Sequence, residues 1–516
     1  MNDFDAIVIG AGHNGLVCAA YLARGGLRTL LLEARPSVGG TASSEPFGGG
    51  TVNICNCDHI TFRTTPISDE LGLAAHGLRY IDLDPSQVNV AWDGSPAWAS
   101  YHSLERTLES IAHSHPSEVE GYRQYARHAI PAMRLVLEAA NDAPTMHGLV
   151  GTVLRRGGRG ASTLLRWSRR SAADIMRSFF RTDALQAPGL LVGPMVWGIS
   201  PEFPRSGLGA LTYGLRHVGS EVFDPDIILH VGSGMVTDAI LSSFQAAGGT
   251  LRTSSRVAAI TCEGPAVRGV RLTDGTEFTA SRVVSACNPH DTFLQWLTDA
   301  PPQARSLVER WRAIPQDDGY ESKIDAITTE VPHLRAAEAG GLVGDMAASY
   351  AIAPSIADMH RGYFAMASGE VLERPGMIAN VPSVDDATLA PAGQHVLSLE
   401  VLYTPYAHPG GWPSSNEPKR WLDQFSSLTQ PGFRESVRVW RAMTPDLYES
   451  DFLLPHGHAT SFAGGPLAAF KNPNPELTSY TTAVNGLYLT GAATFPGAGV
   501  WGASGRNAAH VVLRRA

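Results

Sequence analysis

Cysteine is scarce in this sequence. The 516 residues include five cysteines, and no two of them form a CxxC or CxxxxC pair. They are Cys18, Cys55, Cys57, Cys262 and Cys287. An odd, sparse set in a long chain argues against a disulfide framework and for a reducing compartment. We therefore do not expect a redox-active disulfide in the chemistry of this protein.

Long hydrophobic runs and a basic N-terminus are also missing. The longest apolar stretch, 187–199, is interrupted by prolines and glycines, whereas a membrane-spanning helix needs about 20 predominantly apolar residues. The chain begins with the acidic MNDFDAIVIG, where a secretory signal would be basic. These absences predict a cytoplasmic protein without a membrane span.

Positive charge is in deficit. The formal net charge is −9, with 40 Lys and Arg against 49 Asp and Glu, so no bias toward a polyanion exists and no nucleic-acid partner is expected. Hydrophobic residues make up 44% and charged residues 17%, which is typical of a globular protein. A chain of this length exceeds one ordinary hydrophobic core, so we expect two domains.

A strand, a glycine-rich turn and a helix follow one another at the N-terminus. Ala6–Ile9 is a short apolar run that suits a strand buried on both faces. The turn Gly10–Gly15 comes next, and Leu16–Arg24 has apolar residues at helical spacing. Thr29–Leu32 then predicts a second strand. This order is typical of a dinucleotide-binding βαβ unit.

Each position of the turn has a physical reason. Gly10 allows the tight turn, Gly12 lets the backbone approach a pyrophosphate, and Gly15 lets the helix pack closely on the strand. His13 and Asn14 lie between them, where the helix N-terminus offers free N–H groups and a positive dipole to phosphate. We therefore predict that Gly10 to Gly15 bind the phosphates of a dinucleotide.

An acid and a diglycine identify the dinucleotide. Glu33 ends the second strand, where it would accept a hydrogen bond from a ribose 2′-OH. The sequence from Glu33 to Gly39-Gly40 resembles the second signature of the glutathione-reductase-like flavoproteins, in which this segment turns back along the cofactor. FAD is therefore expected rather than NAD. The cofactor-binding set gains Ala34, Arg35 and Thr41.

A second GxGxxG pattern, at 497–502, has a different interpretation. Too few residues follow it for another βαβ unit, and a predicted strand at 486–490 precedes it. Gly502–Arg514 predicts a helix whose N-terminus would face the flavin pyrimidine and stabilise negative charge on the reduced ring; the alternative is a simple cap on the sheet. The cofactor-binding candidates here are Gly491, Ala492, Val500 and Trp501. Phe495 and Trp501 would wall a substrate cavity, although Trp501 suits a core position equally well.

The two ends together resemble the phytoene desaturase-like FAD oxidoreductases. Residues 10–22, GAGHNGLVCAAYL, look most like the FAD-dependent β-carotene ketolases and their uncharacterised relatives, and 486–492 and 505–509 match as well. The resemblance implies an α/β fold, with a Rossmann-type FAD-binding domain and an interleaved α+β substrate domain. It also implies a backbone contact from Val257 to the adenine side, with Ala286 at the end of a further buried strand.

The chain would pass back and forth between the two domains. The FAD-binding domain is predicted from three segments, 1–100, 226–300 and 476–516. The substrate domain is predicted from a helical segment, 101–225, and a mixed segment, 301–475. No second nucleotide-binding fold is visible, which disfavours an NAD(P)H reductase and favours electrons drawn from the substrate.

The segment Cys55-Asn-Cys-Asp-His59 holds the catalytic candidates. No second ligand group lies at zinc-like spacing, so no metal is expected. A loop placed after the FAD motifs would lie beside the isoalloxazine, where Asp58 or His59 would act as a base or orient substrate. The alternative is a packed loop histidine.

These residues predict a reaction class. We expect a dehydrogenase, desaturase or oxidase, an enzyme of specialised biosynthesis that transfers a hydride from a hydrophobic small molecule to flavin N5. Oxygen or a quinone would be the electron acceptor. The alternatives are a flavin ketolase or monooxygenase, and a non-redox isomerase or FAD-holding scaffold.

One basic stretch stands out in this acidic chain. Residues 154–181 contain eight arginines and a single acid, Asp174, with apolar residues interleaved. Such an amphipathic stretch would lie peripherally on a membrane surface. The alternative is a solvated helical face with ion pairs to acids elsewhere.

Overall fold

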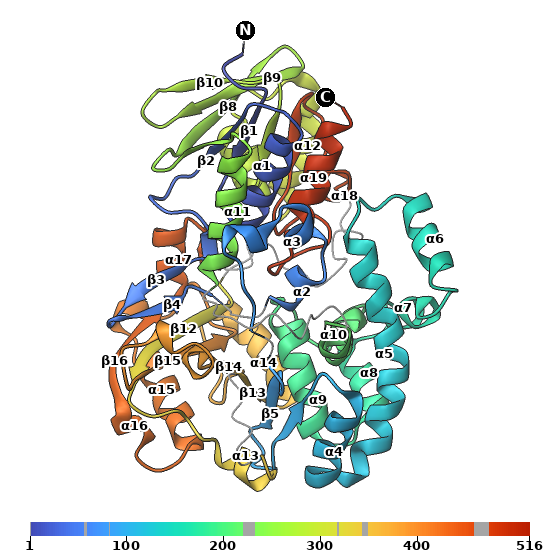
Figure 1. Cartoon of the computed structure of the whole chain (residues 1–516), viewed down its shortest axis with the longest axis vertical. Coiled ribbons are helices and arrows are strands. Elements are labelled where there is room, and N and C mark those ends of the chain that lie inside the picture. Colours follow the sequence, from blue (N-terminus) through green and yellow to red (C-terminus); the bar gives the residue numbers. More distant parts are fainter. Residues whose placement is uncertain are drawn as a thin grey trace.

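The computed structural model describes residues 2–55, 59–81, 83–219, 233–316, 319–342, 349–458 and 474–515. Two parts lie one above the other in Figure 1. The upper part holds both termini and a five-stranded sheet, and the lower part holds a seven-stranded sheet beside a layer of helices.

The five-stranded sheet is parallel and has the order β17-β11-β1-β2-β7. Its strands are β1 (Ala6–Ile9), β2 (Thr29–Leu32), β7 (Thr250–Arg252), β11 (Val283–Ser285) and β17 (Leu487–Leu489). The helices against it are α1 (His13–Arg24), α11 (Gly234–Ala246) and α19 (Ala503–Leu513). The predicted Rossmann-type arrangement is confirmed.

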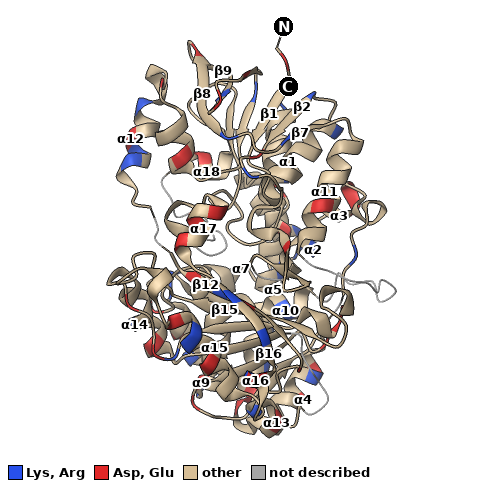
Figure 2. Cartoon of the chain, turned by 90° about the vertical axis from the view of Figure 1, so that its left-hand side faces the viewer, with Lys and Arg blue, Asp and Glu red and all other residues tan. Residues whose placement is uncertain are grey.

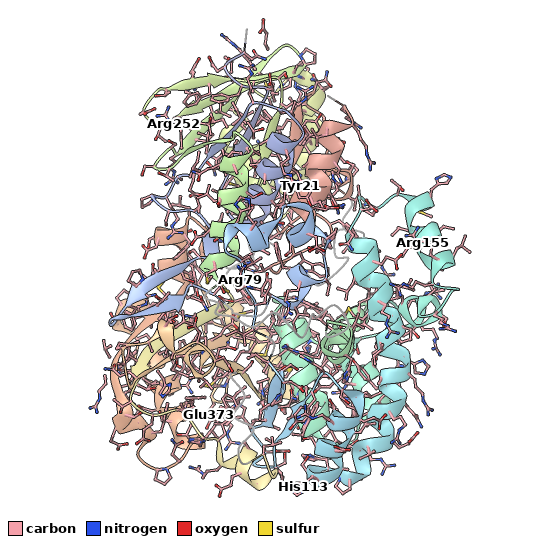
Figure 3. All side chains as sticks on the ribbon, in the orientation of Figure 1. Tyr21, Arg79, His113, Arg155, Arg252 and Glu373 are labelled. Carbon is pink, nitrogen blue, oxygen red and sulfur yellow. The ribbon has the colours of Figure 1, made fainter. Side chains whose placement is uncertain are left out.

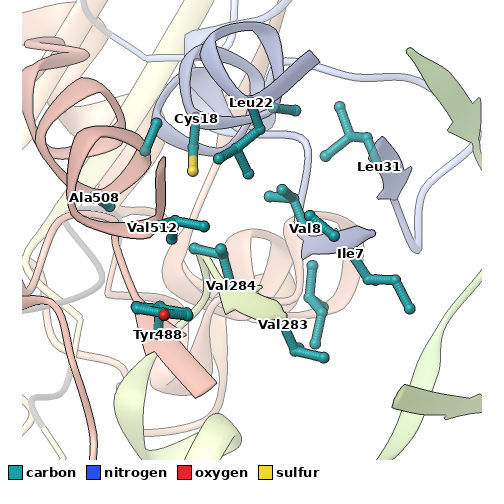
Figure 4. Close-up of a cluster of buried hydrophobic side chains, with 14 of the residues drawn as sticks. Ile7, Val8, Cys18, Leu22, Leu31, Val283, Val284, Tyr488, Ala508 and Val512 are labelled. Atoms are coloured by element: carbon teal, nitrogen blue, oxygen red, sulfur yellow. The ribbon is translucent and has the colours of Figure 1, made fainter. Parts of the chain in front are cut away.

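The core of this upper part explains its sequence. Figure 4 shows Ile7 and Val8 of β1 together with Val283 and Val284 of β11, all fully buried. Strands enclosed on both faces need apolar residues at successive positions rather than in alternation. The helix α19 lies very close to α1, because a Cβ added at Gly505 would be 2.1 Å from the Asn14 carbonyl oxygen.

Small elements complete the upper part. An antiparallel sheet, β8 (Val257–Glu263), β9 (Ala266–Leu272) and β10 (Glu277–Thr279), includes the hairpin predicted around Asp274-Gly275. The short helices are α2 (Ile60–Arg63), α3 (Ile67–Glu70), α12 (Arg305–Ala313) and α18 (Glu476–Ser479). The hairpin β3 (Ser44–Phe47) and β4 (Gly50–Asn53) reaches down toward the lower sheet.

The lower sheet has the order β16-β12-β15-β14-β13-β5-β6 and is largely antiparallel. Its strands are β5 (Gln87–Ala91), β6 (Trp98–Ser100), β12 (Glu321–Thr328), β13 (Ser349–Ala353), β14 (Met377–Asn380), β15 (His395–Leu402) and β16 (Val437–Met443). The helices of this region are α13 (Arg335–Ala339), α14 (Ile356–Ala367), α15 (Glu417–Leu428), α16 (Phe433–Ser436) and α17 (Pro445–Phe452).

A helical layer lies beside this sheet. It comprises α4 (Leu104–Ser114), α5 (Val119–Ala140), α6 (Met146–Arg155), α7 (Ala161–Trp167), α8 (Ala172–Phe179), α9 (Asp183–Leu190) and α10 (Thr212–Gly219). Its interior is aromatic: Tyr122 packs against Trp98, Tyr125 and Tyr213 with ring centroids 5.7, 6.0 and 5.8 Å apart. The layer is the helical block expected at 101–225.

Two segment boundaries differ from those predicted. Strands β5 and β6 precede residue 100 but belong to the lower sheet. Conversely, α12 lies after residue 301, yet its Leu307 and Trp311 pack in the core of the upper part. Local periodicity identifies a strand or helix but not the sheet that it joins, so the pattern could not place these boundaries.

The basic stretch 154–181 is not one amphipathic surface. Trp167, Met176 and Phe180 are buried in the helical layer. Arg155 and Arg156 both pair with Glu138, and Arg177 pairs with Glu202. Within the described ranges, no helix has both the length and the apolar character needed to cross a membrane.

Candidate cofactor and active site

The glycine loop is shaped by close packing at two positions and by open space at a third. Gly10 has φ +93°, and a Cβ at Gly15 would lie 1.9 Å from the Gly10 carbonyl oxygen. Gly12 has an ordinary backbone conformation, φ −66° and ψ 169°, and no atom of the described chain lies within 4 Å of a Cβ added there. The protein itself therefore does not require glycine at position 12, whereas a closely approaching pyrophosphate would.

Glu33 connects the loop to the segment after β2. One carboxylate oxygen accepts the Ala11 N–H and the other accepts the Arg35 N–H, both at 2.8 Å. Each oxygen retains a lone pair, so a ribose hydroxyl can still bind. The carboxylate lies where the sequence predicted it, at the end of the buried strand β2.

The diglycine closes onto the same loop. The Gly39 N–H donates to the Ala11 carbonyl at 2.8 Å, and a Cβ at Gly40 would be 3.3 Å from the Gly12 Cα. Both glycines have positive φ, +105° and +56°. Ala34 and Thr41 flank this contact and are half-buried. The two sequence signatures thus form one surface.

Two polar atoms near this surface lack partners. Asn14 Oδ1 and Arg35 Nη1 are buried without a hydrogen-bond partner in the described structure, although buried polar atoms are normally paired. The Arg35 guanidinium lies 4.0 Å from the centre of the Phe452 ring. Open space at Gly12, an acid at Glu33 and unsatisfied polar atoms fit a bound FAD.

The predicted C-terminal residues lie at the same edge of the sheet. Strands β1, β11 and β17 are parallel neighbours, and Gly10, Ala286 and Gly491 follow their ends. A Cβ at Gly491 would be 3.1 Å from the Ala286 carbonyl oxygen. Ala492 is half-buried in the same turn. The second GxGxxG pattern therefore lies beside the first glycine loop and forms no second nucleotide site.

Two further contacts bring distant candidates to this edge. The Thr61 hydroxyl donates to the Val500 carbonyl at 2.7 Å. Val257 begins β8, close to the acid, since the Ser255 N–H donates to the Glu33 carbonyl at 2.8 Å.

Two histidines lie beside the loop. His59, 6% exposed, immediately precedes α2 and packs edge-on against Tyr80. Burial, with a smaller electrostatic effect of His59, lowers the pKa of His13 to about 4, so His13 is neutral at pH 7. Asp58, the other catalytic candidate, lies outside the described residues, and a catalytic role for His59 stays a prediction.

Trp501 and Phe495 have different surroundings. Trp501, 5% exposed, belongs to an apolar cluster of the lower part that includes Leu191, Met195 and Tyr320. Phe495 is instead fully buried in the core of the upper part. The prediction that Phe495 walls a substrate cavity is therefore wrong, while Trp501 joins the cofactor edge to the apolar interior below it.

A buried polar row between the two parts was not predicted. Cys55 Sγ lies 3.1 Å from Glu321 Oε1 and 3.9 Å from Glu400 Oε1, and both glutamates are buried. Lys323 is the ladder partner of Glu400 and pairs with Asp325. Arg441 on β16 pairs with Asp325 and with Glu45 of the covering hairpin; Figure 2 shows basic residues along β16.

The charges in this row leave one carboxyl pair in excess. Burial and the neighbouring Glu321 raise the pKa of Glu400 well above its usual value. Two adjacent carboxyls near a single ammonium are most stable when they share a proton. The row is therefore balanced by the chain's own cations and by that proton.

The fold and the cofactor edge define the protein as an FAD-dependent oxidoreductase. The sequence pattern of the family described as "Flavin containing amine oxidoreductase" matches residues 15–316. The chain belongs to this family.

Curated relatives match nearly the whole chain. "Pyridine nucleotide-disulfide oxidoreductase domain-containing protein 2" of Mus musculus is 30% identical, over 99% of this chain and 94% of its own length. A component of the limonene dehydrogenase of Castellaniella defragrans is 26% identical, over 99% and 94%. "Phytoene desaturase (lycopene-forming)" of Paracoccus sp. is 24% identical, over 97% and 95%. The predicted likeness to phytoene desaturases is confirmed.

Solved structures share the fold. A variant of putrescine oxidase superposes with a TM-score of 0.61 at 16% identity, over 99% of this chain and 98% of that chain. An oxidoreductase from Methanosarcina mazei gives 0.60 at 15% identity, over 99% and 100%.

Proposed function

We propose that this enzyme oxidises a hydrophobic small molecule by transfer of a hydride from a substrate C–H bond to N5 of FAD. The observation that carries the proposal is the position of Trp501, which follows the cofactor edge in sequence and packs among the apolar side chains of the lower part. A substrate reaching the cofactor from that side would meet an apolar environment. Two relatives named for limonene and phytoene support a hydrocarbon substrate.

The residues of the chain would hold the cofactor and exclude water. Gly12 and the N-terminus of α1 would bind the pyrophosphate, and Glu33 would bind the ribose. The N-terminus of α19 would favour negative charge at the far end of the cofactor, and the side chain of His59 would orient substrate. Bound FAD supplies a two-electron acceptor.

The source of the electrons follows from the sheets. Among the described residues, one sheet is wholly parallel, and the others are antiparallel or mixed. This supports a single dinucleotide fold and a substrate that itself provides the electrons. We propose oxygen or a quinone as the final acceptor.

Anaerobic reduction tests the proposal. The FAD-loaded enzyme is mixed with limonene, with phytoene in detergent, and with putrescine as an amine control, and the visible flavin absorbance is followed. We expect bleaching by a hydrocarbon without NADPH. Reduction by NADPH alone would refute the proposal, and bleaching by putrescine alone would replace the hydrocarbon with an amine.

Product analysis separates the remaining alternatives. Incorporation of labelled oxygen from O₂ into the product would identify a ketolase or monooxygenase. Turnover to an isomer of unchanged mass would identify a non-redox isomerase. The proposal requires a product that has lost two hydrogens and carries no label.

A further inference from the structure

Helices α6 and α7 present an apolar surface to solvent. Six large hydrophobic side chains are exposed within the described ranges, and four of them lie on these two helices. They are Met146 (74% exposed), Val150 (50%), Leu154 (71%) and Leu165 (57%). Residues 146, 150 and 154 recur every four positions, so they share one face of α6. We name these four residues the α6–α7 face.

Positive charge surrounds this face. Residues 146–170 contain six arginines and no Asp or Glu, although the whole chain has a net charge of −9. Arg155 and Arg156 are held by Glu138. The side chains of Arg159, Arg166 and Arg169 are exposed and form no ion pair with any described residue. The face is therefore apolar at its centre and cationic around it.

The surface is preformed. Thr152, on the opposite side of α6, is buried, and α6 packs along α5 at the outer edge of the molecule (Figure 1). Between the two helices, Gly160 has φ +82°, and a Cβ there would lie 2.4 Å from the Pro131 carbonyl oxygen of α5. Figure 3 shows Arg155 at the same outer edge. No ordering of the chain is needed before this face binds.

We infer that the α6–α7 face docks onto the surface of an anionic lipid bilayer. An amphipathic helix lies in the membrane interface when an apolar face enters the acyl boundary and arginines bind the headgroups. The charge favours lipid over protein, because the cores of protein interfaces are depleted of charge, whereas three unpaired arginines complement phosphate. This inference is independent of the reaction.

Vesicle flotation with the FAD-loaded enzyme tests it. We expect binding to vesicles of phosphatidylglycerol and phosphatidylcholine, weaker binding to phosphatidylcholine alone, and loss of binding in high salt. Each arginine near an anionic surface contributes roughly fivefold to partitioning, so R159Q/R166Q/R169Q should bind on the order of a hundredfold more weakly. L154S/L165S should bind at least about tenfold more weakly, because both side chains leave the acyl boundary.

Matched controls use the same changes elsewhere. R268Q/R271Q/R312Q removes three exposed arginines of the upper part, and V439S removes an apolar side chain of β16 that is 39% exposed. Both should bind vesicles as the wild type does. Absence of flotation by the wild type, or equal loss in the controls, overturns the inference. Concentration-dependent dimerisation that L154S/L165S abolishes, without vesicle binding, would assign the face to a second copy of the chain instead.

Discussion

Replacing Gly12 by alanine should separate cofactor binding from folding. The backbone at this residue, φ −66° and ψ 169°, is open to alanine, and no described atom lies within 4 Å of the new Cβ. The free energy of unfolding of the apoprotein should therefore change by no more than about 0.5 kcal/mol. The same methyl group would occupy the space through which the pyrophosphate approaches the helix N-terminus.

The expected loss of affinity follows from that displacement. A hydrogen bond to a charged group contributes about 1.5–3 kcal/mol, so losing one from the pyrophosphate predicts FAD binding about 10- to 150-fold weaker. Titration of the apoprotein with FAD, followed by flavin fluorescence, measures the affinity. Urea unfolding of the same apoprotein measures the stability.

Gly15→Ala provides the contrast. Its Cβ would lie 1.9 Å from a backbone oxygen, so both folding and FAD binding should be lost. The reasoning is refuted if Gly12→Ala binds FAD as tightly as the wild type. It is equally refuted if Gly12→Ala lowers apoprotein stability by more than about 2 kcal/mol, a cost typical of a disturbed packed site.

Three further changes test the surroundings of the site, each through unfolding of the apoprotein. Because the folded pKa of His13 is about 4 against 6.5 in a model peptide, stability should be full above pH 6.5 and fall by up to about 3 kcal/mol as the pH drops toward 4; H13Q should flatten this slope, and an unchanged slope would contradict a neutral His13. The raised pKa of Glu400 has the opposite sign: its cost is absent below the unfolded pKa of about 4.5 and grows as the pH rises. E400Q should therefore be at least about 1 kcal/mol more stable than wild type at pH 8, and a loss of stability at every pH would rule out the shared proton. W501A should lower stability by about 3–5 kcal/mol and W501F by much less, whereas equal effects would show that packing of the indole is unimportant.

The sequence predicted the upper part of the fold well. The strands at Ala6–Ile9 and Thr29–Leu32 have the bounds expected for them, because apolar runs between glycines leave no alternative to a doubly covered strand. The helix expected at Gly502–Arg514 spans Ala503–Leu513. In these cases a local pattern and the global fold agree.

The polar row shows why the rest was missed. Glu321, Lys323 and Asp325 alternate along β12, a pattern typical of a strand with one face in water, yet all three are fully buried. The cover comes from the hairpin at 44–53, whose Asn53 carbonyl accepts a hydrogen bond from Lys323 at 2.5 Å. More than 250 residues separate the two segments, so no local pattern encodes their meeting.

The strand order of the parallel sheet has a consequence for synthesis. Its central pair, β1 and β2, is complete by Leu32, while the edge strand β17 begins at Leu487. At about 5–20 residues per second, the intervening chain takes roughly 20 to 90 seconds to emerge from a ribosome. Until then the most hydrophobic strands and the glycine loop are without β17 and α19. We expect FAD to be captured only after α19 has emerged, and the nascent chain to depend on chaperones during that interval.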